Sequence, residues 1–168
     1  PRNSMGKVQK ARLRRRFSVS VRVATLDDAE VLVAGNAAMA SETEGLDLDL
    51  TTLREGVNRG LQGAARYWIA ERDGSFAGQA MLTREWSDWR NGWIGWLQSV
   101  WVEPDHRRHA VFRSLYEHIV TTLRAEGHIN LRLYVHNDND AAATVYERLG
   151  MEREQYGVSA RFFGGPRT

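Results

Sequence analysis

The sequence predicts a single α/β domain in which a mixed sheet carries helices on both of its faces. Segments with strand-like alternation and segments with apolar residues at helical spacing follow one another along the chain. A length of 168 residues suits one domain with a proper core and is short for two. An apolar content of 42% is typical of a packed globular protein rather than a disordered one.

The first part of the predicted domain is a strand followed by two helices. Ser20–Thr25 alternates polar and apolar residues, as a half-buried strand does. Thr25 then caps a helix that we expect to run to about Ala40, with two aspartates in its first turn. The acidic stretch SETEGLDLD is predicted to be a loop. A second helix is predicted from four apolar residues at helical spacing: Leu50, Leu53, Val57 and Leu61.

The middle of the chain is predicted to be three strands in succession. They are ARYWIAER (65–72), SFAGQAMLTREW (75–86) and WIGWLQSVWVE (93–103). The dipeptide DG at 73–74 is typical of a tight hairpin turn, and SDWRNG forms the second turn.

The last part alternates helices and strands. A third helix, ending near Gly127, is predicted from an apolar stripe: Val111, Leu115, Ile119 and Leu123. The strand INLRLYV (129–135) follows, and then the short helix AAATVYERLG, which Gly150 ends. REQYGVSARFF (153–163) is predicted as the closing strand. The predicted order is therefore β-α-α-β-β-β-α-β-α-β.

Charge is unevenly distributed along the chain. Residues 1–16 hold seven of the 23 Lys and Arg and no acid, so we expect a disordered basic arm before a single domain at 17–168. Residues 1–4 resemble an expression-tag remnant before a natural start at Met5. The acidic remainder favours a cationic small molecule over nucleic acid. A nucleic-acid-associated protein led by the arm stays open as an alternative.

Several classes of site are excluded by composition. The chain has no cysteine, which excludes disulfides, thiolate metal sites and a cysteine nucleophile. We expect no metal cofactor. No apolar run approaches the roughly 18 residues that a membrane helix needs, and no signal-peptide core is visible. These observations predict a cytoplasmic protein without a membrane partner.

The stretch VEPDHRRHAVFRSLY reads as a strand end, a tight loop and a helix start. A helix N-terminus has amide groups without acceptors and the positive end of the dipole, and such places bind phosphate oxygens. No residue from Arg107 to Arg113 is proline, so every amide donor is present. Arg107, Arg108 and Arg113 add charge and fork geometry. The pattern indicates a phosphate-binding loop, although basic residues before a helix are often simply solvated.

The order of elements and two motifs resemble the GNAT superfamily of acyl-CoA N-acyltransferases, from Val21 to about Phe162. The family loop has the form Arg/Gln-x-x-Gly-x-Gly/Ala, and here RRHAVF occupies that frame without its glycines. VWVEP (100–104) matches the strand that leads into the loop. The second family motif, Asn-x-x-Ala-x-x-x-Tyr-x-x-x-Gly-Phe, matches this chain at Asn139, Ala142, Tyr146 and Gly150, with Met151 in place of Phe.

This resemblance implies a GNAT-type mixed central sheet with splayed parallel strands, and acetyl-CoA as co-substrate. It implies that the backbone of the fourth strand pairs with the pantetheine arm and that the splayed partner strand is LYVHN. It also implies that Tyr146 is the general acid for the departing thiolate. The residues implied to contact the cofactor are Val100, Trp101, Val102, Arg107, Arg108, His109, Ala110, Val111, Phe112, Arg113 and Asn139.

Missing glycines change what the loop can do. Glycine is required where φ is positive or where a Cβ would strike the ligand. We expect Ala110 to be accommodated at a negative φ, and Phe112 to pack under the loop or to narrow the pantetheine channel. Side-chain cations are then expected to replace the close approach that glycine gives.

The acceptor side lacks an obvious base. Related polyamine acetyltransferases carry a glutamate two residues before the position of Val100, where this chain has Gln98, which cannot take a proton. The predicted acceptor contacts are Glu42, Glu44, Trp86, Asp88 and Gln98. The acids are either solvated loop residues or part of the pocket. Trp86, Trp89, Trp93 and Trp96 are either core residues or a surface for an ammonium group.

The sequence therefore predicts an N-acetyltransferase that moves an acetyl group from acetyl-CoA directly to an amine, either a small cationic amine or another amino-group substrate. The alternative is a non-catalytic acyl-CoA sensor or partner module of GNAT fold. Tyr146 favours the enzyme, whereas Gln98, Ala110 and Phe112 leave the alternative open. A homodimer stays open as well.

Overall fold

The computed structural model describes residues 18–135, 139–155, 157–161 and 163. The chain divides into two compact units between Leu133 and Tyr134. Among the described residues, the first unit contains the sheet and most helices, and the second contains one helix. The predicted basic arm, 1–16, lies outside the described residues.

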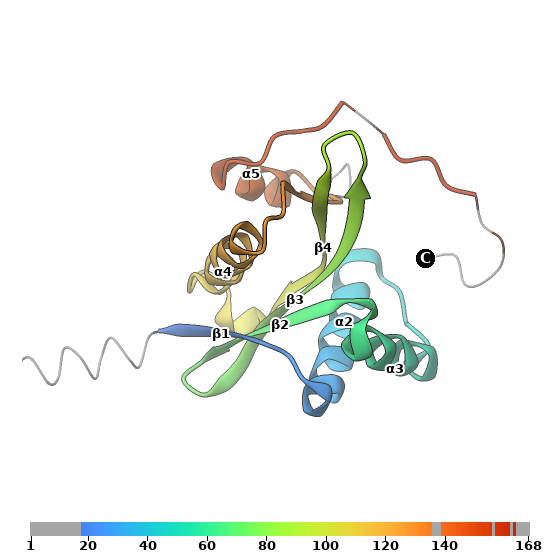
Figure 1. Cartoon of the computed structure of the whole chain (residues 1–168). Coiled ribbons are helices and arrows are strands. Elements are labelled where there is room, and N and C mark those ends of the chain that lie inside the picture. The colour runs from blue at the N-terminus through green and yellow to red at the C-terminus, as the bar shows by residue number, and fades with distance from the viewer. Residues whose placement is uncertain (1–17, 136–138, 156, 162, 164–168) are drawn as a thin grey trace, which may run out of the picture. The chain divides into compact units, whose positions relative to one another are not determined.

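The first unit is built on a five-stranded sheet in the order β1-β2-β3-β4-β5 (Figure 1). The strands are β1 (Val19–Val23), β2 (Arg66–Arg72), β3 (Ser75–Ser87), β4 (Gly92–Val102) and β5 (Asn130–Leu133). The pairs from β1 to β4 are antiparallel, and β4 and β5 are parallel. This confirms the predicted mixed sheet, with β5 shorter than its predicted range of 129–135.

Helices cover both faces of this sheet, as predicted. One face packs against α2 (Ala29–Glu44) and α3 (Leu50–Arg59), and the other packs against α4 (Val111–Ala125). Short helical turns link the elements: η1 (Leu26–Asp28), η2 (Gly60–Ala64) and η3 (Pro104–His106). The predicted apolar stripe of the third helix is buried on α4: Val111, Leu115, Ile119 and Leu123. Burial of this stripe holds α4, and therefore the loop before it, against the sheet.

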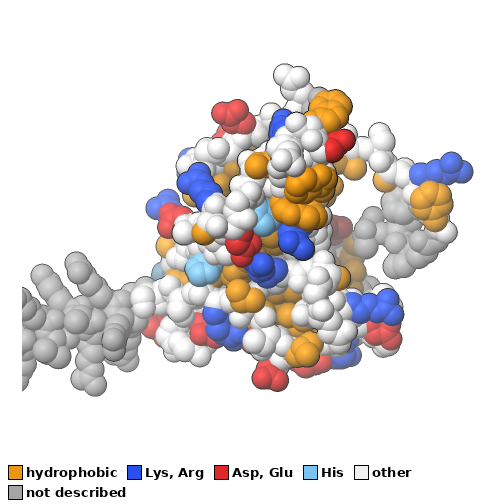
Figure 2. Space-filling view, in the orientation of Figure 1, with side chains coloured by type: hydrophobic (Ala, Val, Ile, Leu, Met, Phe, Trp, Pro, Cys, Tyr) orange, Lys and Arg blue, Asp and Glu red, His pale blue; other side chains and the backbone are white. Residues whose placement is uncertain are grey.

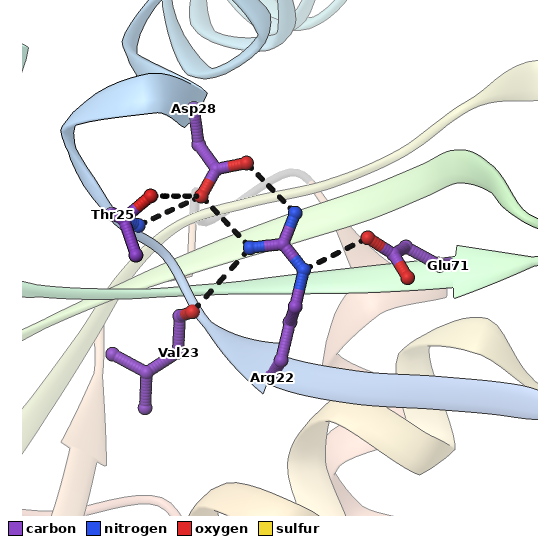
Figure 3. Close-up of polar contacts among 5 residues, drawn as sticks. All are labelled: Arg22, Val23, Thr25, Asp28 and Glu71. Atoms are coloured by element: carbon purple, nitrogen blue, oxygen red, sulfur yellow. Dashed lines mark hydrogen bonds and ion pairs between the residues drawn. The ribbon is translucent and has the colours of Figure 1, made fainter.

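The start of the α2 segment is fixed to the sheet by an ion pair. Arg22 of β1 donates two hydrogen bonds of 2.8 Å to the Asp28 carboxylate and a third of 2.8 Å to Glu71 on β2 (Figure 3). The Asp28 carboxylate also accepts from the backbone amide of Thr25 at 2.7 Å, which completes a capping box. The predicted helix start at Thr25 is confirmed, although its first turn is a 3-10 turn.

The end of α2 corrects the prediction for SETEG. The helix runs to Glu44, so these acidic residues form its last turn rather than a loop. Gly45 ends the helix in the left-handed conformation, with φ of 65°. Glutamate and alanine propagate a helix well, and the helix stops at the glycine that adopts a left-handed conformation.

The parallel pair β4–β5 ends before β4 does. Its last register pair is Leu97 with Leu133, whereas β4 continues to Val102. A bulge shifts the register between β3 and β4 at the same place, where Ser99 has a positive φ of 48°. The end of β4 therefore has backbone groups that β5 does not pair, as expected for strands that splay apart.

The second unit contains α5 (Asp140–Arg148). The Asn139 side chain caps this helix by accepting from the amide of Ala142 at 3.0 Å, and Gly150 follows it with φ of 84°. The predicted closing strand at 153–163 is wrong for the residues that the structure describes there, which form no strand. Alternation alone does not stabilise a strand, because a strand also needs a neighbour to pair with.

The surface gives no sign of a membrane span. Within the described ranges, every helix is too short or too polar to cross a bilayer. On the face shown in Figure 2, basic and acidic side chains are interspersed, and no single sign of charge dominates.

Candidate active site

The loop between β4 and α4 has an unusual backbone. After η3, Arg108 and Ala110 both adopt left-handed conformations, with φ of 63° and 62°, and α4 begins at the next residue, Val111. The expectation of a negative φ at Ala110 is therefore wrong. The chain keeps the backbone that glycine favours without having glycine, at a cost of about 1–2 kcal/mol for each left-handed residue.

This backbone is suited to an anion. Left-handed residues that alternate with residues of ordinary φ turn successive amides toward one side and form an anion-binding concavity. The first amides of α4 add donors without acceptors inside the helix, and the helix dipole adds positive potential. The side chains of Arg108 and Arg113 are exposed here. The loop backbone, the helix terminus and the two arginines thus have the features that the predicted phosphate-binding role requires.

Phe112 lies in the first turn of α4 and is half-buried. Its ring centroid is 6.1 Å from that of Tyr116, one turn further along the same helix. This contact gives the large side chain a partner at the second glycine position of the family pattern.

The last residues of β4 pack their side chains against the core, and β5 does not pair with their backbone. Val100 and Val102 pack their side chains against the core beneath α4. Trp101 is buried on the opposite face, where its ring stacks on Phe76 at 6.3 Å. The side chains are thus committed to the two cores, whereas the backbone register with β5 ends at Leu97 and the Val102 carbonyl accepts from Nε of Arg107.

Arg107 and Glu42 form a bidentate ion pair. Nη1 and Nη2 of Arg107 donate to the two carboxylate oxygens of Glu42 at 2.6 and 2.5 Å, and Nε donates to the Val102 carbonyl at 3.1 Å. The arginine lowers the pKa of Glu42 below its usual range, mainly through these hydrogen bonds, and the carboxylate raises the pKa of Arg107. One residue predicted for the cofactor and one predicted for the acceptor therefore bind each other.

Gln98 lies on the sheet face that α2 covers, and its Nε2 donates to Oγ1 of Thr83 at 2.8 Å. Two charged residues on this face, Glu85 and Arg132, were missed by the sequence analysis. Glu85 accepts from Trp96 Nε1 at 2.6 Å, and its Oε1 lies 3.5 Å from Nη1 of Arg132. The alternation of Thr83 and Glu85 along β3 could have indicated Glu85, since alternate residues face the same side.

The tryptophans do not form one box. Trp86 and Trp93 pack edge to face at 5.1 Å on the opposite face of the β3–β4 hairpin from Gln98, and Trp89 is 92% exposed in the turn. Arginines of the chain itself lie over two of the rings, Arg84 over Trp93 and Arg132 over Trp96. These rings already have cations.

The remaining acidic candidates lie apart from one another along the chain. Asp88 is in the β3–β4 turn, where its Oδ1 accepts from the amide of Trp89 at 2.9 Å. Glu44 is the last residue of α2 and is exposed. Because Trp86 and Gln98 lie on opposite faces of the β3–β4 hairpin, the structure does not bring all five predicted acceptor contacts onto one surface.

Tyr146 lies on α5 in the second unit and is half-buried. Burial raises the pKa of its phenol above the ordinary value. Such a phenol stays protonated at neutral pH and keeps a proton to give. Asn139, predicted both as a cap and as a cofactor contact, performs the first of these roles.

Comparison with known proteins identifies the family. The family model described as "Acetyltransferase (GNAT) family" matches residues 38–151. A solved structure of a possible acetyltransferase from Clostridium difficile 630 is 33% identical, with 88% of this chain and 99% of that chain covered and a TM-score of 0.82.

Two more distant structures share the fold. A ribosomal-protein-alanine N-acetyltransferase from Brucella melitensis biovar Abortus 2308 is 18% identical, covers 88% of this chain and 100% of its own, and has a TM-score of 0.72. A predicted acetyltransferase with acetyl-CoA from Clostridium acetobutylicum is 17% identical, covers 86% and 96%, and has a TM-score of 0.71. No curated protein matched the chain. By the matched model and the 33% identical structure, the chain is a member of the GNAT acetyltransferase family.

Proposed function

We propose that this chain transfers an acetyl group from acetyl-CoA directly to the nitrogen of a small cationic amine. The observation that carries the proposal is the loop with two left-handed residues, which connects the end of β4, where β5 no longer pairs with it, to the N-terminus of α4. Family membership supports acetyl transfer in general. The choice of an amine as acceptor, and transfer to it in a single direct step, go beyond what family membership supports and are proposed here.

The cofactor's pyrophosphate is assigned to the loop. The amides from Arg108 into the first turn of α4 would donate to its oxygens, and the side chains of Arg108 and Arg113 would balance its charge. The edge from Val100 to Val102, which β5 does not pair, would pair with the amide-bearing pantetheine arm, apart from the Val102 carbonyl, which accepts from Arg107. These donors fit the ligand, because backbone amides and arginines bind phosphate oxygens and a strand edge pairs with the amide groups of pantetheine.

Catalysis is assigned to the backbone and to one side chain. Acetyl-CoA supplies the acetyl group as a thioester. A backbone N–H at the end of β4 would donate to the carbonyl oxygen as charge develops on it. The C–N bond to the amine would form as the C–S bond breaks, and the attacking nitrogen would lose a proton to solvent. Tyr146, kept protonated by burial, would give its proton to the departing sulfur and regain one from solvent.

The acceptor is assigned to the α2-covered face of the sheet. Gln98 has its Nε2 turned to Thr83, which leaves Oε1 as an acceptor for an amine N–H. Glu85 also lies on this face, where Trp96 and Arg132 contact its carboxylate. The uncharged Oε1 of Gln98 accepts hydrogen bonds and therefore suits an amine, which carries N–H donors.

The test is release of free thiol from acetyl-CoA by the purified chain, with a panel of polyamines, amino sugars and lysine-like amines. We expect amine-dependent release with at least one acceptor and calorimetric binding of CoA. Binding of CoA without turnover on any amine would favour the non-catalytic acyl-CoA module instead. Absence of CoA binding would contradict both assignments.

A second arm of the test locates the phosphate site. Arg108→Glu should weaken binding of CoA more than binding of acetyl-pantetheine, which has no pyrophosphate, because the reversed charge repels phosphate. Arg90→Glu, an equally exposed arginine in the β3–β4 turn, is the control and should leave both affinities unchanged. Equal loss for both ligands on Arg108→Glu would show that the loop does not hold phosphate.

A further inference from the structure

We infer that the Glu42–Arg107 ion pair is a positioning device that holds the phosphate-binding loop in its binding-competent backbone from the last turn of α2. The inference rests on the proposed function of that loop. It assigns these two residues a role through the backbone rather than as direct contacts of either substrate.

The Arg107 side chain closes the loop back onto β4. Its Nε donates to the Val102 carbonyl at 3.1 Å, and its two terminal nitrogens donate to Glu42 at 2.6 and 2.5 Å. All three nitrogens of the guanidinium therefore have acceptors on the protein. The guanidinium of Arg107 is therefore directed toward α2. We assign the binding of phosphate to the backbone amides of the next residues, Arg108 to Ala110, which precede α4.

Glu42 is held in turn from a second side. Nε1 of the buried Trp101 donates to its Oε2 at 3.5 Å. The carboxylate lies in the last turn of α2, which contains no basic residue, and a negative charge is disfavoured at that end of a helix dipole. The cation that compensates comes from the loop, 65 residues further along the chain. Helix end and loop therefore stabilise each other.

The position of Arg107 explains why this matters for the loop. It is extended, with φ of −65° and ψ of 154°, and it directly precedes left-handed Arg108. Strained left-handed residues persist only where the surrounding structure fixes them. Glycine at 110 would adopt this backbone without strain, whereas Ala110 needs the chain before it to be held. The ion pair supplies that constraint at the residue where the turn begins.

The experiment compares Glu42→Gln, Arg107→Gln and the double variant in the full chain. We expect each single variant to raise the Kd for CoA and the KM for acetyl-CoA about 5- to 10-fold, because a competent loop populated at about 10–20% weakens apparent affinity by that factor. The double variant should be no weaker than either single one, since both remove the same constraint. Values of kcat at saturating acetyl-CoA, and binding of acetyl-pantetheine, should change less than twofold.

The matched control is the Glu30–Arg54 pair between α2 and α3. It is also bidentate, with distances of 2.7 and 2.9 Å, and both side chains are exposed. Glu30 is near the start of α2 and Glu42 near its end, so Glu30→Gln removes a similar ion pair away from the loop. Glu30→Gln should leave the Kd for CoA unchanged.

Two results would overturn the inference while leaving the proposed function intact. If wild type binds CoA and Glu42→Gln binds it equally well, the pair does not position the loop. If Glu42→Gln binds CoA more tightly while Arg107→Gln loses affinity, Arg107 is a direct phosphate ligand that Glu42 restrains. Failure of wild type to bind CoA would instead contradict the proposed function.

Discussion

Arg108 and Ala110 have the same left-handed backbone, with φ of 63° and 62°, on either side of His109. Neither residue is glycine, although both adopt a conformation that costs glycine no steric strain. The loop therefore stores strain at the point where it presents its amides, and this strain can be measured by removing it.

Ala110→Gly should stabilise the protein. Relief of about 1–2 kcal/mol of left-handed strain, less about 0.4–1 kcal/mol for the extra freedom of glycine in the unfolded chain, leaves a net gain of up to about 1.6 kcal/mol and of about 0.8 kcal/mol at the middle of both ranges. Chemical denaturation checks it. Ala34→Gly, at an exposed site inside α2, is the control and should destabilise by about 1 kcal/mol. Destabilisation by both variants would show that Ala110 is not strained.

Asp28→Asn should destabilise the fold by about 1–2 kcal/mol at pH 7. Arg22 lowers the pKa of Asp28 to about 2, first through its hydrogen bonds. At ~1.36 kcal/mol per pK unit the shift would exceed 2 kcal/mol, and solvent screening at the half-exposed Arg22 reduces it. Denaturation of wild type and variant at one pH measures the difference.

The same pair predicts a pH dependence. Because the folded-state pKa of Asp28 is depressed, its contribution is complete above the unfolded value near 3.8 and is lost as pH falls toward 2. The stability difference between wild type and Asp28→Asn should therefore be constant from pH 6 to 8 and shrink below about pH 4. A difference that persists undiminished at pH 2 would contradict the assignment.

Local patterns were sufficient for most of the fold. The apolar stripe of α4 and the turn at Asp73 and Gly74 were predictable, because periodicity and turn chemistry act within a few residues. The end of α2 was predicted too early, since an acidic composition says little about where a helix stops. The closing strand failed because pairing is decided by distant residues.

Long-range contacts at the candidate site could not be read from the sequence. Glu42 and Arg107 were assigned to different substrates, and nothing near either one in sequence indicates the other. The bulge at Ser99 likewise sets which side chains of β4 face α2, and it is visible only in the strand register. Ala110 was expected at a negative φ because its side chain disfavours any other, and the fold overrides that preference.

Tyr146→Phe should lower kcat by about 10²–10⁴, the range for a positioned acid or base, with little change in the Kd for CoA. Burial raises the pKa of this phenol, so wild-type kcat should not fall from loss of its proton below about pH 10. Tyr116→Phe is the control, because burial also raises the pKa of Tyr116 on α4. Normal turnover in folded Tyr146→Phe would remove Tyr146 from the mechanism.

The last prediction concerns the proton of the amine. A lysine-like ammonium has a pKa near 10.4, so only about one molecule in 2,500 is neutral at pH 7. Gln98 accepts no proton, and Arg107 lowers the pKa of Glu42, which makes Glu42 a still weaker base. The amine is therefore expected to arrive neutral from solution, and kcat/KM should rise about tenfold per pH unit from pH 6 to 9.

Mutations separate attraction of the amine from base catalysis. Glu44→Gln should raise the KM for the amine while kcat and the slope with pH hold, if this exposed carboxylate only attracts the cation. Gln98→Glu should flatten the slope by placing a proton acceptor beside Thr83. A flattened slope in Glu44→Gln would identify Glu44 as a base. If the acceptor is anionic or uncharged and its turnover is the same in wild type, Glu44→Gln and Gln98→Glu, the acidic side chains do not select the substrate.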